Sequence, residues 1–129
     1  MLITMFYAGL LGFVFLVISV RVIIGRTTTK TNMGDGGNPK MLRLMRGHAN
    51  FAEYVPLTLV LMGMFEAHAA PLWLVHAIGA SLLVGRLLHG YTFAFSDHFF
   101  IGRFVGTNLT FAALATAAGG CLWHGIGAL

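Results

Sequence analysis

Charged residues are scarce in this sequence. Only 9% of its 129 residues are Asp, Glu, Lys or Arg, whereas soluble domains carry roughly 25%. A soluble domain of this length could not cover its surface with so few polar groups, and 57% of the residues are hydrophobic. Cysteine is limited to Cys121, which excludes an intrachain disulfide and is expected to act as a small buried hydrophobe. The composition indicates an integral membrane protein.

Four long apolar segments predict four transmembrane helices, at about residues 2–24, 41–67, 71–95 and 103–126. The first carries no charge until Arg21 and lacks the positive start of a cleavable signal peptide, so we expect it to be retained. A polar loop, RTTTKTNMGDGGNPK, follows it, and Pro39 is suited to open the second helix. The short link EAHAAP predicts an antiparallel hairpin of the second and third helices. The expected fold is an all-α, single-domain four-helix membrane bundle.

The basic residues fall on one side of this predicted bundle. All eight lie in or beside the first and third loops, which share a side: Arg21, Arg26, Lys30, Lys40, Arg43, Arg46, Arg86 and Arg103. The other side has Glu66 and His68 in its short link and the uncharged end GIGAL. Because basic residues favour the cytoplasmic side of a membrane, both termini are expected outside the cytoplasm.

The second predicted helix carries polar residues into the bilayer. At about 100° per residue, one stripe about 80° wide holds five of its side chains, with Tyr54 at the edge: Arg43, Arg46, Asn50, Glu53 and Leu57. His48 points nearly the opposite way. Arg43 is well explained as a residue that reaches the headgroups, but an unpaired Glu53 two turns inside Arg46 is costly. The stripe lies in the cytoplasmic half, so its ligand is expected to arrive from the cytoplasm.

Other polar residues fall at the same predicted depth, at the ends of the other helices: Arg21, Arg86, His89, Tyr91 and Arg103. Several arginines around the single carboxylate of Glu53 form an anion-binding pocket with one acceptor. Arginine holds carboxylates in a planar, bidentate fork. The pattern therefore favours a small zwitterionic or polyanionic ligand that carries carboxylates and an amine.

The string R-x-H-x-N-F-x-E-Y-x-P, at residues 46–56, resembles the signature of the MAPEG family, the membrane-associated proteins of eicosanoid and glutathione metabolism. The resemblance covers nearly the whole chain: four helices, a long first loop, a short second link and an arginine that opens the fourth helix. The short chain and compact loops are similar to the small bacterial members. The resemblance implies a homotrimer in the bacterial inner membrane, with glutathione held between neighbouring subunits near the cytoplasmic face.

The same resemblance implies roles for individual residues. Four positions of the second helix match glutathione-binding positions: Arg46, Asn50, Glu53 and Tyr54. The other binding positions are expected in the first and third helices: Arg21, Arg86, His89 and Tyr91. Arg103 matches the arginine that supports the glutathione thiolate in the catalytic members. The tyrosine that the family pattern places past His89 is Phe93 here, although Tyr91 is close.

The function implied is that of a glutathione transferase or peroxidase. A cation near the sulfur favours the thiolate, which can attack a lipophilic electrophile from the bilayer or reduce a hydroperoxide. Two other classes remain open: a non-catalytic lipid-binding or scaffold protein, and a small proton-coupled multidrug exporter in which Glu53 carries the proton. The arginines disfavour the exporter, because they would hold Glu53 ionised and repel cations. No metal site is expected, since no histidine pair has ligand spacing on a shared face, and no nucleic-acid partner is expected.

Overall fold

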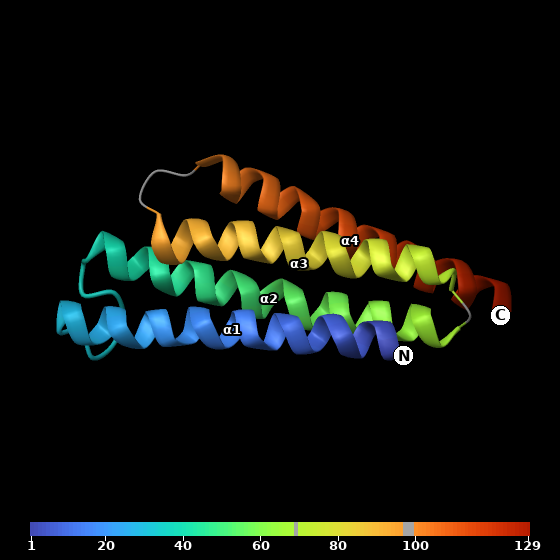
Figure 1. Cartoon of the computed structure of the whole chain (residues 1–129), viewed down its shortest axis with the longest axis horizontal. Coiled ribbons are helices and arrows are strands. Elements are labelled where there is room, and N and C mark those ends of the chain that lie inside the picture. The colour runs from blue at the N-terminus through green and yellow to red at the C-terminus, as the bar shows by residue number, and fades with distance from the viewer. Residues whose placement is uncertain (69, 97–99) are drawn as a thin grey trace.

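In the computed structural model, which describes residues 1–68, 70–96 and 100–129, the chain forms four long antiparallel helices (Figure 1). They are α1 (Leu2–Thr29), α2 (Pro39–Ala67), α3 (Leu72–Phe95) and α4 (Phe100–Ala128). The predicted all-α four-helix fold is confirmed. α1 runs further than predicted because the hydroxyls of its last threonines donate to carbonyls of the preceding turn, at Ile23 and Gly25, so that polar residues continue the helix.

The loop between α1 and α2 is held by local hydrogen bonds. Lys30 ends α1 in the left-handed conformation, with φ 52°, and its N–H donates to the Arg26 carbonyl. Asn38 caps α2 by accepting from Lys40 N at 2.9 Å and Met41 N at 3.2 Å. Pro39 occupies the first turn, as predicted, where its missing N–H costs nothing.

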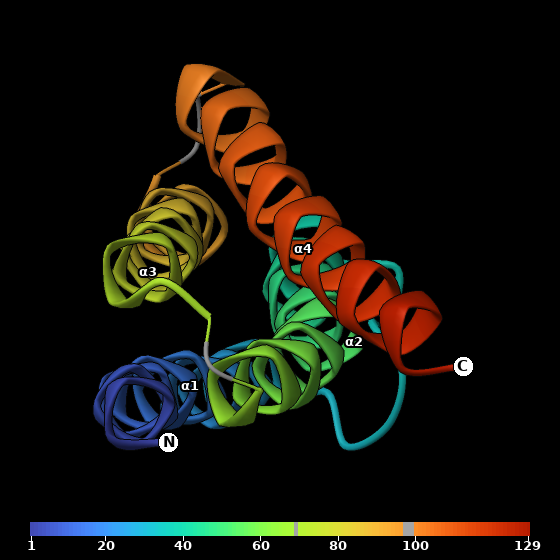
Figure 2. The ribbon, with the colours of Figure 1, turned by 90° about the vertical axis from the view of Figure 1, so that its right-hand side faces the viewer.

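The helices are arranged so that α2 and α3 each contact all three of the others. Within the described residues, α1 and α4 do not touch, and Figure 2 shows them on opposite sides of the α2–α3 pair. At the crossing of α3 and α4, a methyl group on Gly106 would lie 2.6 Å from the Gly85 carbonyl oxygen. These two glycines therefore let the two backbones approach closely, as small residues do in membrane bundles.

Three of the helices are long and apolar enough to cross a membrane: Leu2–Thr29, Leu72–Phe95 and Ile101–Ala128. α2 is also long, at 29 residues, but the polar side chains of its first half make it less apolar. Large apolar side chains stand exposed on the outside of the bundle, among them Phe13, Trp73 and Trp123. Such a surface suits lipid rather than water.

Glu66 joins the N-terminus of α1 to the end of α2. Its carboxylate accepts from the backbone N–H groups of Ile3 at 3.0 Å and Thr4 at 2.8 Å, and from the Thr4 hydroxyl at 2.6 Å. The Met1 ammonium lies 3.3 Å from the same carboxylate. Glu66 thus caps a neighbouring helix, where an acidic group is favourable.

Both termini lie at one end of the bundle (Figure 1), and the two loops beside the basic residues lie at the other. Because basic residues stay in the cytoplasm, we expect the C-terminus to face out. An alkaline phosphatase fused after Leu129 should be active, and a green fluorescent protein fused there should be dark. The reverse pattern would contradict the orientation and the side from which a ligand enters.

Candidate functional site

Arg86 of α3 is the buried centre of the candidate site, with 1% of its surface exposed. Its Nη1 donates to Asn50 Oδ1 of α2 at 2.8 Å, and its Nη2 lies 3.5 Å from the Gly106 carbonyl oxygen of α4. One guanidinium thus links three helices. Because a guanidinium can only donate, Asn50 presents its oxygen to Arg86 and leaves its NH2 for another partner. In the described part of the chain, Arg86 has no carboxylate partner and its Nε has no acceptor, so the region is electropositive.

Beside Arg86, three side chains form a stack that runs from α3 to α4. His89 is buried, with 4% of its surface exposed, and its ring stacks on the Phe93 ring with the two centroids 4.5 Å apart. The Arg103 guanidinium carbon lies 5.7 Å from the centroid of the Phe93 ring. α2 packs against this stack at Gly47, where a side chain would collide with Phe93. In the sequence, Phe93 stands out only as the replacement for the tyrosine of the family pattern, but its spacing of four residues from His89 places both on one helix face.

Two charged residues of the predicted stripe face outward in the single chain, whereas Arg43 is half-buried. Arg46 and Glu53 are both exposed. Tyr54 is half-buried, and the centroid of its ring lies 5.3 Å from that of the Phe111 ring on α4. Glu53 lies fourteen residues after Pro39, which places it about 20 Å along α2 at 1.5 Å per residue. A carboxylate at that depth on the outside of a membrane helix is costly if it meets lipid.

Arg21 and Tyr91 lie on a different face. Arg21 of α1 donates twice to the Ala94 carbonyl near the end of α3, from Nε at 3.2 Å and Nη2 at 2.8 Å. Its guanidinium carbon also lies 4.7 Å from the centre of the Phe95 ring, on which the exposed Tyr91 stacks. One chain therefore brings together Asn50, Arg86, His89 and Arg103, and separately Arg21 and Tyr91.

His48 takes no part in the polar stripe, as its helical angle predicts. Its Nε2 lies 3.1 Å from Ser19 Oγ of α1, and its ring packs at 4.7 Å on Phe15. Since the Ser19 hydroxyl donates to the Phe15 carbonyl at 2.8 Å, it accepts from His48, which places the proton on Nε2. His48 thus fastens α1 to α2.

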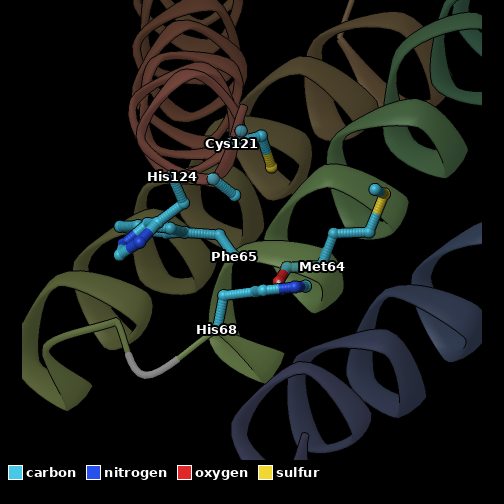
Figure 3. Close-up of a pocket in the computed structure, with 7 residues that line it drawn as sticks. Met64, Phe65, His68, Cys121 and His124 are labelled. Atoms are coloured by element: carbon cyan, nitrogen blue, oxygen red, sulfur yellow. Dashed lines mark hydrogen bonds between the residues drawn. The ribbon is translucent and has the colours of Figure 1, made fainter.

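A concave region lies at the opposite end of the bundle, near the termini. It is a pocket of about 180 Å³ between α2 and α4 (Figure 3), lined by Met64, Phe65, His68, Cys121, His124, Gly125 and Ala128. The Cys121 thiol donates to the Leu61 carbonyl at 3.1 Å. In residues 1–68, 70–96 and 100–129, no three His, Cys, Asp or Glu side chains are placed to hold a metal ion.

The sequence of this chain is similar to those of known membrane proteins. The profile of the MAPEG family matches residues 4–123, a span that includes almost all of the four helices. The chain belongs to the MAPEG family. It is also 35% identical over 118 residues to the "Inner membrane protein YecN" of Escherichia coli strain K12 and to the protein of that name in Escherichia coli O6:H1 strain CFT073. Each match covers 92% of this chain and 88% of the relative.

MAPEG membership confirms the family that the residue 46–56 motif indicated. The apolar helices and the inner-membrane relatives confirm that the chain is an integral membrane protein. The roles of the site residues, the bound ligand and the number of subunits remain predictions.

Proposed function

We propose that this MAPEG protein binds glutathione at the cytoplasmic half of the bundle and transfers it to lipophilic electrophiles or uses it to reduce hydroperoxides. The observation that carries the proposal is the buried Arg86, which has no carboxylate partner among the described residues and orients Asn50 between the exposed charges of α2. A buried cation without a counter-ion favours an anionic ligand nearby. Family membership supplies the glutathione-related context.

Glutathione matches the charges of this region. It carries two carboxylates, one ammonium and one thiol. Arg46 and Arg86 are suited to the carboxylates, the Asn50 NH2 to a carbonyl or carboxylate oxygen, and Glu53 to the ammonium. The same charges oppose the exporter alternative, since a cationic drug would have to approach several arginines.

We further propose that the working form is a homotrimer, as the family resemblance implies. Arg46 and Glu53 stand exposed on the outside of one chain at membrane depth, where a neighbouring copy would shield them from lipid. A site between subunits can also draw residues from two faces of the chain, such as Glu53 from one subunit and Arg21 from another.

The chemistry assigned to this site is thiolate attack. Arg103 lies in the first turn of α4, where unpaired N–H groups add positive potential to its own charge. Both favour the thiolate after the thiol proton passes to water. With chlorodinitrobenzene, the sulfur would form a bond to the ring carbon and chloride would leave. With a lipid hydroperoxide, two glutathione molecules would yield an alcohol, water and glutathione disulfide.

Glu53→Gln should weaken glutathione binding by roughly 1–3 kcal/mol, because the ligand ammonium loses a charged acceptor. Titration calorimetry of the purified protein in detergent measures the change. Asp35→Asn is a matched control: it removes one carboxylate from the first loop, where the Asp35 side chain accepts from Gly37 N, and should bind as the parent does. Equal affinity of Glu53→Gln and the parent would show that Glu53 does not receive the ammonium.

A further inference from the structure

The Phe93 ring is held rigidly by two helices. α2 comes so close at Gly47 that a methyl group there would lie 2.5 Å from Phe93 Cβ and 3.0 Å from Phe93 Cγ. On its own helix, His89 stacks on the ring at an interplanar angle of 18°. His89 is itself buried, and its backbone lies against Gly106 of α4. Packing against α2 and His89 therefore restricts how far the ring can turn.

Arg103 has the opposite character. It is exposed, and none of the residues that the structure describes forms a hydrogen bond or ion pair with its guanidinium. Its contact is with Phe93, whose ring centroid lies 5.7 Å from the guanidinium carbon. An aromatic face attracts a guanidinium through its quadrupole, and the attraction leaves the N–H donors available.

The packed ring of Phe93 and the exposed side chain of Arg103 affect each other. A side chain as long as that of Arg103 has many rotamers, and ordering it costs conformational entropy. Attraction to a fixed ring selects rotamers that keep the charge beside His89 and Arg86. It does so without occupying a donor that a ligand needs.

We propose that Phe93 is a positioning residue that holds the Arg103 guanidinium over its ring face and so directs the cation at the sulfur of bound glutathione. This inference rests on the proposed function and explains how an exposed arginine can be oriented towards the sulfur. Phe93 itself touches no reacting atom. Its role is to attract the Arg103 guanidinium and so reduce the number of rotamers that this side chain samples.

The test is a fluorination series at Phe93. One, two and three fluorines progressively remove negative charge from the ring face while nearly preserving its shape, so folding is maintained. The kcat for chlorodinitrobenzene and the ultraviolet absorbance of bound thiolate should fall stepwise with each fluorine, by roughly 3- to 30-fold over the series. KM for glutathione should change less than twofold, because Arg46, Asn50 and Glu53 still hold the tripeptide. The same series at the lipid-exposed Phe13 should have no effect.

Two substitutions extend the test. Phe93→Tyr keeps the ring and should retain most of the parent rate, whereas Phe93→Leu should lose about as much as the trifluoro ring. In an Arg103→Ala background the fluorines should have no further effect, because the cation they act on is gone. A flat fluorine series, or equal fluorine effects with and without Arg103, would overturn the positioning role while leaving glutathione transfer intact. A parent protein with no thiolate signal and no turnover would instead overturn the proposed function and, with it, this inference.

Discussion

Arg103→Ala is expected to lower the rate of glutathione conjugation by about 100-fold, the typical loss when one preorganised cation or donor is removed from a developing anion. The same change should abolish the thiolate absorbance of bound glutathione at neutral pH, because the thiol pKa returns towards its value in water. Glutathione affinity should fall far less, since the side chains assigned to the carboxylates and the ammonium lie on α2 and α3 and remain in place. A rate effect that exceeds the affinity effect is the signature of a group acting in the transition state.

Lys40→Ala is the matched control for that experiment. Lys40 is an exposed cation in the first turn of α2, on the same side of the membrane, and it belongs to no part of the proposed site. Its removal should leave both rate and thiolate signal unchanged. Equal losses in the two variants would mean that general positive charge, rather than Arg103, supports the reaction. An unchanged rate in Arg103→Ala would exclude Arg103 from the chemistry.

The largest effect on stability is expected at the crossing of α3 and α4. Gly106→Ala places a methyl group 2.6 Å from the Gly85 carbonyl oxygen and 2.9 Å from the His89 backbone nitrogen. These are backbone atoms, so the helices must separate rather than a side chain rotate. Overpacking of this kind costs about 1–3 kcal/mol. The separation should also break the contact between Arg86 and the Gly106 carbonyl. A lower midpoint of thermal unfolding in detergent measures the loss of stability.

Gly119→Ala provides the comparison on the same helix. Nothing lies within 4 Å of the position that its methyl group would occupy. Since alanine is the better helix former by roughly 1 kcal/mol, this variant should be as stable as the parent or slightly more so. If both variants behave alike, close approach at Gly106 does not limit stability.

Much of the fold could be predicted from the sequence because lipid imposes strict length and hydropathy requirements. Four helices, the short hairpin link and the opening of the second helix at Pro39 all follow from those requirements and from local backbone preferences. The end of α1 was placed too early. Its last residues are polar, and hydropathy does not register the threonine hydroxyls that satisfy carbonyls in the preceding turn.

The candidate site was predictable only in part. The α2 motif pointed to Asn50 and Glu53, of which Asn50 contacts Arg86 and Glu53 is exposed, and helical geometry separated His48 from them. That Arg86 would be buried and hold Asn50 depends on the tertiary packing of α3 against α2 and α4, which no periodicity reveals. The sequence singled out Phe93 only as the residue that stands where the family pattern places a tyrosine. Its significance comes from Gly47 and Arg103, which are distant in sequence and adjacent in the fold.

We propose that the charged half of α2, together with Arg86 packed against it from α3, binds glutathione between copies of this chain. Native mass spectrometry of the purified protein released from detergent, with and without added glutathione, tests both parts in one measurement. We expect an assembly of three chains whose mass rises by bound glutathione, and a smaller bound fraction for Glu53→Gln at the same concentration. A single chain, or three chains that bind no glutathione at millimolar concentration, would contradict the account. The second outcome would favour a lipid-binding or scaffold member of the family.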